Sequence, residues 1–178
     1  MTAAPLIHIC GWPGSGKRTI ARRLRDRIGA RLIDNHLILD PASALFDRGT
    51  PERAALRERL RAVLYDAAVG LPPEAPLILT DALAQTDVHR ALWQSTQRLA
   101  HARGAPLRPV LLQIDLQENL RRLTDPRRAD WDKLTDPARL EDLRRDHALL
   151  QLPDAFVLDV TELSPDAAAA EIEAAIHG

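Results

Sequence analysis

Three glycines and a lysine near the amino terminus have the spacing of a loop that binds phosphate. They fall in the stretch Gly11-Trp12-Pro13-Gly14-Ser15-Gly16-Lys17-Arg18-Thr19, which follows an apolar run over 6–10 and precedes a helix-patterned run over 20–28. In a strand–loop–helix setting, glycines let successive backbone N–H groups point at one anion, and the dipole of the following helix adds to the attraction. We therefore expect this stretch to bind a polyphosphate.

The residue after the lysine departs from that pattern. Where the Gly-x-x-x-x-Gly-Lys motif has a serine or threonine to hold Mg²⁺, the sequence has Arg18, and Thr19 follows one position later. A guanidinium group has no lone pair to offer a cation. The sequence therefore predicts that Mg²⁺ is held by Thr19, Asp34, Asp81 or water, or that the dependence on metal is weak.

Acidic side chains follow two other short apolar runs. Asp34 and His36 lie at the polar end of the predicted strand over 30–36, and Asp81 ends the run over 75–81. Ligands of open α/β sheets bind beyond the carboxyl ends of the strands, so these side chains are expected at the site. Asp34 is a candidate general base for a hydroxyl group or a Mg²⁺ ligand, and Asp81 is a candidate support for Mg²⁺. The alternatives are that Asp34 caps a turn and that His36 only satisfies backbone groups.

The segment 121–137 is the most polar part of the chain. It carries four arginines and one of only two lysines in the sequence, namely Arg121, Arg122, Arg127, Arg128 and Lys133. A basic segment of this kind can close over a polyphosphate, exclude water and neutralise charge on a transferring group, which predicts a lid. The alternative is a solvated loop in which the nearby aspartates cancel much of the charge.

Residues 50–69 have the pattern of a helix with Thr50 as its N-cap. The face expected to be buried is apolar and comprises Ala55, Leu56, Leu60, Val63, Leu64 and Ala67. The opposite face carries Arg53, Arg57, Arg59 and Arg61. Such a face is usually solvated, although one or two of its arginines could reach an acceptor substrate. Residues 40–46, just before this helix, are expected to be irregular or weakly helical.

The composition limits the class of protein. With 178 residues, 46% of them hydrophobic and 28% charged, the chain is long enough for one domain over 1–178. A net charge of −1 argues against bulk binding to nucleic acid or to an anionic membrane. Cys10 is the only cysteine, which suits a reducing cytoplasm. No run approaches the roughly eighteen apolar residues of a membrane span, so we expect a soluble, cytoplasmic protein.

Apolar runs alternate with helix-patterned segments along the whole chain. The runs over 6–10, 30–36, 75–81, 107–114 and 155–159 are predicted strands, separated by predicted helices. This order is typical of a parallel sheet with crossover helices. The predicted fold class is therefore α/β, with a five-stranded parallel sheet flanked by helices in three layers. A helical substrate-binding region is expected over about 36–70 and the lid over about 121–137.

Together, these features resemble the small P-loop kinases. The group includes shikimate kinases, gluconate kinases and nucleoside monophosphate kinases, and the resemblance extends over essentially the whole chain. Residues 32–36 look like the acid-x-acid end of the second strand in shikimate kinases, with His36 in place of the second acid. Residues 77–83 and 87–90 look more like the third strand and helix start of gluconate kinases, which argues against shikimate as the acceptor.

The resemblance implies a three-layer P-loop NTPase fold and transfer of the γ-phosphoryl group of ATP, with Mg²⁺, to a hydroxyl group of a small molecule such as a sugar acid, a nucleoside or an antibiotic-like compound. The implied nucleotide-binding residues are Gly11, Pro13, Gly14, Ser15, Gly16, Lys17, Arg18, Thr19 and Arg127. The implied catalytic residues are Lys17, Asp34, Arg122, Arg128 and Lys133. The implied metal ligands are Thr19, Asp34 and Asp81, and the implied acceptor contacts are Asp34, His36, Arg53, Arg57 and Asp81.

Two alternatives stay open at this point. One is a nucleoside or nucleotide kinase whose acceptor already carries a phosphate, gripped by Arg48, Arg53 or Arg57. The other is a non-catalytic nucleotide-binding protein, which an arginine at position 18 would suit. In each case the expected partner is a small molecule rather than a nucleic acid or a membrane, and the protein is expected to be a monomer or a homodimer.

Overall fold

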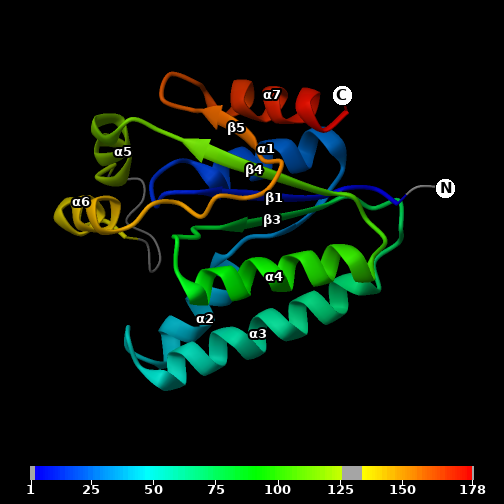
Figure 1. Cartoon of the computed structure of the whole chain (residues 1–178), viewed down its shortest axis with the longest axis horizontal. Helices are drawn as coiled ribbons and strands as arrows, with labels where there is room; N and C mark the ends of the chain where they lie inside the picture. Colours follow the sequence, from blue (N-terminus) through cyan, green and yellow to red (C-terminus); the bar gives the residue numbers. More distant parts are fainter. Residues whose placement is uncertain (1–2, 126–133, 178) are drawn as a thin grey trace.

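The computed structural model describes residues 3–125 and 134–177. Its centre is a five-stranded sheet formed by β1 (Leu6–Gly11), β2 (Arg31–Ile33), β3 (Leu77–Asp81), β4 (Leu107–Gln113) and β5 (Phe156–Asp159). Neighbouring strands are parallel and lie in the order β2-β3-β1-β4-β5, with β1 in the middle (Figure 1). The carboxyl ends of β1, β2 and β3 therefore meet at one edge of the sheet.

Helices cover both faces of this sheet. They are α1 (Lys17–Ile28), α2 (His36–Leu45), α3 (Pro51–Val69), α4 (Asp87–Ala102), α5 (Leu116–Leu123), α6 (Pro137–Asp146) and α7 (Pro165–His177). α1 and α7 pack together on one face, and α3 and α4 pack together on the other (Figure 1). The predicted three-layer α/β fold is confirmed. Within the described part of the chain, no helix combines the length and the apolar character needed to span a membrane.

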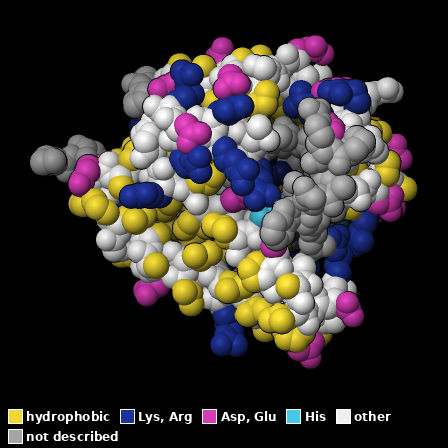
Figure 2. All heavy atoms as spheres, turned by 180° about the vertical axis from the view of Figure 1, so that it is seen from behind, with side chains coloured by type: hydrophobic (Ala, Val, Ile, Leu, Met, Phe, Trp, Pro, Cys, Tyr) yellow, Lys and Arg dark blue, Asp and Glu magenta, His cyan; other side chains and the backbone are white. Residues whose placement is uncertain are grey.

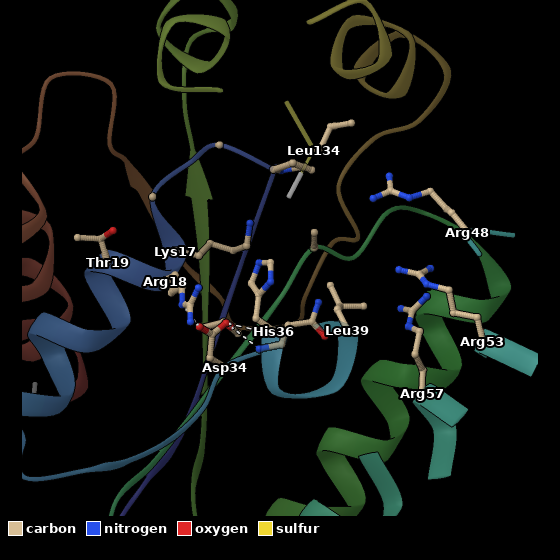
Figure 3. A pocket seen from close by; sticks show the side chains of 16 residues that line it. Lys17, Arg18, Thr19, Asp34, His36, Leu39, Arg48, Arg53, Arg57 and Leu134 are labelled. Carbon is tan, nitrogen blue, oxygen red and sulfur yellow. Dashed lines mark hydrogen bonds and ion pairs between the residues drawn. The ribbon is translucent and has the colours of Figure 1, made fainter. Parts of the chain in front are cut away.

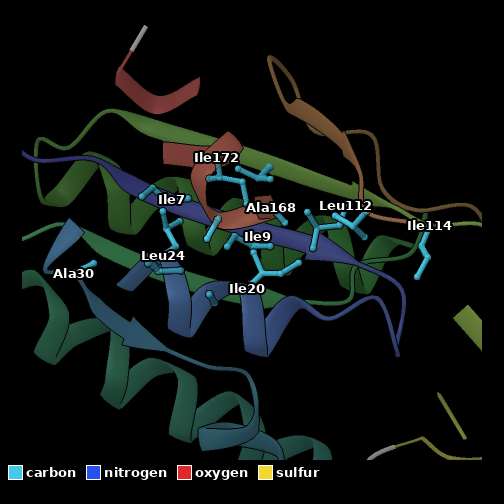
Figure 4. Close-up of a cluster of buried hydrophobic side chains, with 14 residues drawn as sticks. Ile7, Ile9, Ile20, Leu24, Ala30, Leu112, Ile114, Ala168 and Ile172 are labelled. Atoms are coloured by element: carbon cyan, nitrogen blue, oxygen red, sulfur yellow. The ribbon is translucent and has the colours of Figure 1, made fainter. Parts of the chain in front are cut away.

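The core explains why the central strands are largely apolar. Every residue of β1 is buried. On one face, Ile7 and Ile9 pack in a cluster with Ile20 of α1 (Figure 4). On the other face, Leu6 packs in a cluster with Tyr65 of α3. A strand covered on both faces has no reason to alternate polar with apolar residues, so its nearly all-apolar run was a reliable signal.

α3 buries a different face from the one expected. Thr50 caps it as predicted, because its hydroxyl accepts a hydrogen bond from the N–H of Arg53 over 3.3 Å. However, Val63 is 67% exposed, whereas Arg53 and Arg61 are buried. The apolar face is only partly buried, because Leu56, Leu60 and Leu64 are half-buried and the rest of it is exposed. Arg61 takes a place in the core because it finds partners there, and its guanidinium group lies 5.6 Å from the centre of the Tyr65 ring. Hydropathy takes no account of such partners.

One other segment differs from expectation, and another lies partly outside the described residues. Residues 40–45, expected to be irregular or weakly helical, belong to α2, with Pro41 inside the helix. Proline removes one backbone donor, but α2 packs against α3 and its helix continues through Pro41. Only the ends of the expected lid are described, in α5 and before α6, because residues 126–133 lie outside the described ranges. The lid therefore stays a prediction.

Candidate phosphate and acceptor site

A pocket of about 380 Å³ lies where the segments after β1, β2 and β3 meet. Lys17 and Arg18 of the loop and α1 line one side, and Asp34 lies beneath them. Arg53 and Arg57 of α3 line the far side (Figure 3). Three stretches that the sequence singled out separately are thus brought to one cavity.

The phosphate loop is closed by its own lysine. Lys17 Nζ donates hydrogen bonds to the carbonyl oxygens of Gly11 and Trp12, each over 2.8 Å. Gly14 has a φ angle of 87°, in the left-handed region, and a Cβ atom there would lie 2.6 Å from Asn119 Nδ2. Glycine is therefore required at this turn, where the backbone curls around the position of an anion.

Residues of α5 and α6 hold the outer side of the loop. Asn119 Nδ2 donates to the carbonyl oxygen of Pro13 over 2.8 Å, and Asn119 Oδ1 accepts from Arg144 Nη1 over 3.0 Å. The Arg144 guanidinium group also lies over the Trp12 ring, 5.8 Å from its centre. Sequence reasoning missed Asn119 and Arg144, because contacts between segments more than a hundred residues apart leave no local pattern.

Arg122, an expected catalytic cation, lies beside the loop. Its Nε donates to Glu118 over 2.6 Å, and its Nη2 donates to two carbonyl oxygens after β5 over 2.8 and 2.9 Å. Its Nη1 lies 3.8 Å from the position that a Cβ atom on Gly16 would take. Hydrogen bonds from Arg121 and Arg122 lower the pKa of the Glu118 carboxyl group to about 2. Arg122 is thus anchored to protein groups with one nitrogen turned to the loop.

Asp34 lies beneath the loop with both carboxylate oxygens engaged. Its Oδ2 is 2.5 Å from Nε of Arg18, in an ion pair (Figure 3). Its Oδ1 accepts hydrogen bonds from Thr80 Oγ1 over 3.1 Å and from the N–H of His36 over 3.3 Å. The last contact is the turn-capping arrangement considered as an alternative, so Asp34 both caps the turn and faces the pocket.

The remaining acceptor candidates line the same cavity. His36 begins α2, and its Nδ1 is 2.8 Å from Oδ1 of Asp40 one turn later. Arg53 donates from Nε and Nη2 to Ser43 Oγ over 3.1 and 2.7 Å. The guanidinium groups of Arg48, Arg53 and Arg57 line the side of the pocket that faces the loop, and we call these three residues the arginine wall (Figure 3). On the face seen in Figure 2, basic side chains gather near the middle of the molecule although the net charge is only −1.

Asp81 does not line this pocket. Its buried Oδ1 accepts from Arg61 Nη2 over 3.1 Å, and its Oδ2 lies 3.2 Å from His8 Nε2. Burial alone would raise the pKa of Asp81, but the hydrogen bond with His8 and the Arg61 guanidinium group hold it below its ordinary value. Successive residues of a strand point to opposite faces, so when Thr80 faces Asp34, the next side chain must face α3. The structure places Asp81 in a buried ion pair instead of the expected metal and acceptor position.

A line of contacts joins this ion pair to the pocket. Arg61 Nη2 also lies 3.4 Å from Asn35 Oδ1, and the N–H of Asn35 donates to Thr80 Oγ1 over 3.1 Å. The same Thr80 hydroxyl then donates to Asp34. Sequence reasoning missed Thr80 and the role of Arg61. One signal for Thr80 was present in the sequence. Thr80 directly precedes Asp81 near the end of β3, and neighbouring residues of a strand point to opposite faces of the sheet.

The described residues do not fit the Mg²⁺ site that the motif usually provides. Arg18 has no lone pair, and Asp34 is paired with it. Thr19 is exposed, and its side chain lies apart from Lys17 (Figure 3). Over 3–125 and 134–177, no three His, Cys, Asp or Glu side chains are grouped closely enough to hold a metal ion. The expected cations Arg127, Arg128 and Lys133 lie outside the described residues, so their roles stay predictions.

Several known proteins resemble this chain in sequence or in fold. No family model matches the sequence. The chain is 28% identical over 145 residues to a shikimate kinase of Corynebacterium efficiens, covering 75% of this chain and 85% of that protein. A gluconokinase from Sinorhizobium meliloti has a TM-score of 0.64 at 15% identity, over 99% of this chain and 95% of its own. A shikimate kinase from Acinetobacter baumannii, in complex with shikimate, has a TM-score of 0.61 at 16% identity, over 99% and 94%.

The two solved structures share the fold, and the curated relative adds sequence similarity over three quarters of the chain. The phosphate loop stands at the end of the central strand, with Lys17 closing it and an acid, Asp34, beside it. The chain therefore has the fold of the small P-loop kinases and is similar in sequence to a shikimate kinase.

Proposed function

We propose that this kinase transfers the γ-phosphoryl group of ATP to a hydroxyl group of a small molecule that also carries an anionic group. One observation carries the proposal: the phosphate loop and Asp34 line one side of a pocket of about 380 Å³, and arginines line the other. A cavity of this size suits a small metabolite. Sugar acids fit this description, as do nucleosides or antibiotic-like compounds that bear an acidic group.

The nucleotide half of the pocket is assigned to the loop. Phosphoryl transfer depends mainly on positioning and on electrostatic stabilisation of the transferring group. The loop N–H groups and Lys17 would hold the β- and γ-phosphates, and Arg122 would add charge from the side of Gly16. From the expected lid, Arg127, Arg128 and Lys133 would add further cations. No step is assigned to Mg²⁺, because the described residues do not supply its usual ligands.

The acceptor half of the pocket is assigned to Asp34 and the arginine wall. The acceptor hydroxyl oxygen forms a bond to the γ-phosphorus while the bond from that phosphorus to the β–γ bridging oxygen breaks. The hydroxyl proton passes to a carboxylate oxygen of Asp34, and ADP leaves with the electron pair of the broken bond. His36 lines the same cavity and would contact the acceptor.

The wall of Arg48, Arg53 and Arg57 supports an acceptor with a carboxylate or a phosphate. Guanidinium groups bind both anions through paired hydrogen bonds. The same wall supports the second candidate, a nucleoside or nucleotide kinase whose acceptor already bears a phosphate. The two candidates differ in which anion the wall binds, so an acceptor series separates them.

The test is an acceptor screen read by release of ADP. It compares sugar acids, nucleosides, nucleoside monophosphates and hydroxylated antibiotics, each with a matched compound that lacks the anionic group. On the best acceptor, Asp34→Asn should lower kcat by about a hundredfold or more, while ATP still binds. Asp26→Asn, at an exposed position of α1, is the matched control and should retain full turnover.

Three results would overturn the proposal or one of its assignments. Full turnover by Asp34→Asn would remove the assigned base. Tight ATP binding without turnover on any acceptor would instead favour a nucleotide-binding protein without kinase activity. Equal rates with and without the acceptor's anionic group would refute the assignment of the arginine wall.

A further inference from the structure

Arg18 occupies the place at which a phosphate loop usually contributes a hydroxyl ligand to the metal ion. It directly follows Lys17 and is the second residue of α1. Its guanidinium group is always charged and can only donate hydrogen bonds. The substitution therefore exchanges a metal ligand for a fixed positive charge at the same place.

The geometry leaves part of this charge available to a ligand. Arg18 Nε contacts Asp34 Oδ2 over 2.5 Å, and the arginine side chain is 30% exposed. Within the described ranges, the two Nη groups of Arg18 form no hydrogen bond, and the contact with Asp34 is made by Nε. Arg18 also lines the pocket next to Lys17 (Figure 3). One edge of the guanidinium group thus holds Asp34, and the other remains for an anion bound at the loop.

Asp34 keeps Arg18 in place. The carboxylate is only 6% exposed, and its second oxygen is held by Thr80 and the His36 N–H. A buried carboxylate held by three partners is a fixed anchor for a long and flexible side chain. The arginine therefore needs little further ordering when a polyphosphate binds.

We propose that Arg18 donates from its Nη groups to the β- and γ-phosphates of the nucleotide and supplies the charge that a metal ion supplies in other phosphate loops. Nucleotide binding by this chain then depends little on Mg²⁺. This inference rests on the proposed function only in taking a nucleoside triphosphate or diphosphate as the ligand. The competing account is that Arg18 does no more than neutralise Asp34.

Calorimetric titration of the full chain with ATP and with ADP tests the proposal, in excess MgCl₂ and in EDTA. For the natural sequence, the Kd in EDTA should be within about threefold of the Kd in MgCl₂. Arg18→Thr, which restores the motif hydroxyl, should weaken binding in EDTA by about tenfold or more, because a charge-assisted contact is lost. Arg22→Thr, at an exposed position one turn further along α1, should leave both values unchanged.

A double variant separates the two accounts and guards against misfolding. Arg18→Thr leaves the buried Asp34 without its cation, whereas Arg18→Thr with Asp34→Asn removes both charges together. If Arg18 contacts phosphate, the double variant still binds ATP about tenfold or more weakly in EDTA than the natural sequence does. If it binds as tightly as the natural sequence, Arg18 only neutralises Asp34 and the proposal is wrong.

Loss of binding by the natural sequence in EDTA would also overturn the proposal. These titrations record binding and not turnover, so their outcome is independent of the acceptor screen. Metal-independent binding without any acceptor turnover would refute the proposed function and leave the role of Arg18 intact. Phosphoryl transfer together with strictly metal-dependent ATP binding would support the proposed function and refute the role of Arg18.

Discussion

Arg61 Nη2 lies 3.1 Å from Oδ1 of Asp81 in the interior, and the two side chains are 8% and 5% exposed. This ion pair ties the middle of α3 to the carboxyl end of β3. Arg53 and Arg57 project from the preceding turns of the same helix towards the pocket. The position of the proposed acceptor wall is therefore set partly by a contact in the core.

Removing one partner of this pair should destabilise the fold. Arg61→Met leaves Asp81 charged and without its guanidinium partner in the interior, so we expect the free energy of unfolding to fall by about 3–5 kcal/mol. Arg59→Met, at an exposed position of the same helix, should change it by less than about 0.5 kcal/mol. Urea denaturation at neutral pH measures both. Similar losses for the two variants would show that the ion pair contributes little.

Acid should weaken the fold through Asp81. Because its pKa is lower in the folded chain than the ordinary value of 3.8, the unfolded chain binds the proton more readily. The stabilisation is therefore complete above about pH 5 and is lost as the pH falls through the folded pKa. The stability difference between the natural sequence and Asp81→Asn should narrow below about pH 4, and Asp26→Asn should show no comparable trend. A difference that stays constant down to pH 2 or so would contradict this prediction.

The phosphate loop should not tolerate a side chain at Gly14. Gly14→Ala introduces a Cβ atom 2.6 Å from Asn119 Nδ2 at a φ angle of 87°, so we expect both lower stability and a loss of ATP affinity of about tenfold or more. Gly29→Ala is the matched control, since Gly29 also has a left-handed φ, of 66°, but has nothing within 4 Å of its Cβ position. It should cost about 1–2 kcal/mol of stability and leave ATP binding unchanged. Calorimetry and denaturation separate the two effects, and normal ATP binding by Gly14→Ala would refute the assigned loop geometry.

The arginine wall should act on the acceptor and not on the nucleotide. Arg57→Ala is expected to raise the KM for an anionic acceptor by about tenfold or more, with the Kd for ATP changed by less than about twofold. Steady-state kinetics with the acceptor found in the screen measures the first value, and calorimetry the second. Arg59→Ala, on the exposed face of α3, should change neither. A weaker affinity for ATP with an unchanged acceptor KM would place Arg57 on the nucleotide side.

The sequence predicted the elements that local pattern determines. The nearly all-apolar run of β1, the Thr50 cap of α3 and the glycine spacing before Lys17 all depend on residues close together in the chain. Each of these features arises from interactions between neighbouring residues, so a short stretch of sequence is enough to predict it. They were sufficient to predict the fold class and the position of the phosphate loop.

Ion pairs and hydrogen bonds between distant segments could not be predicted from local sequence patterns. Arg61 looked like a solvated arginine because its partner, Asp81, lies twenty residues further along the chain. Asp81 in turn looked like a site residue because it ends a strand, and only the contact between Thr80 and Asp34 decides which face it takes. The sequence shows that Arg18 departs from the phosphate-loop motif, but its ion pair with Asp34 could be identified only from the folded structure.

The two sides of the pocket come from separate stretches of the chain. The loop and Asp34 belong to the segment 11–34, whereas the arginine wall belongs to 48–57, where α2 and α3 pack against each other. Residues 53 and 57 can therefore be changed without altering the residues proposed to bind the nucleotide. If the proposed function holds, a scaffold divided in this way is suited to redesign, because changes confined to one short helical region would alter the acceptor and leave the phosphate donor the same.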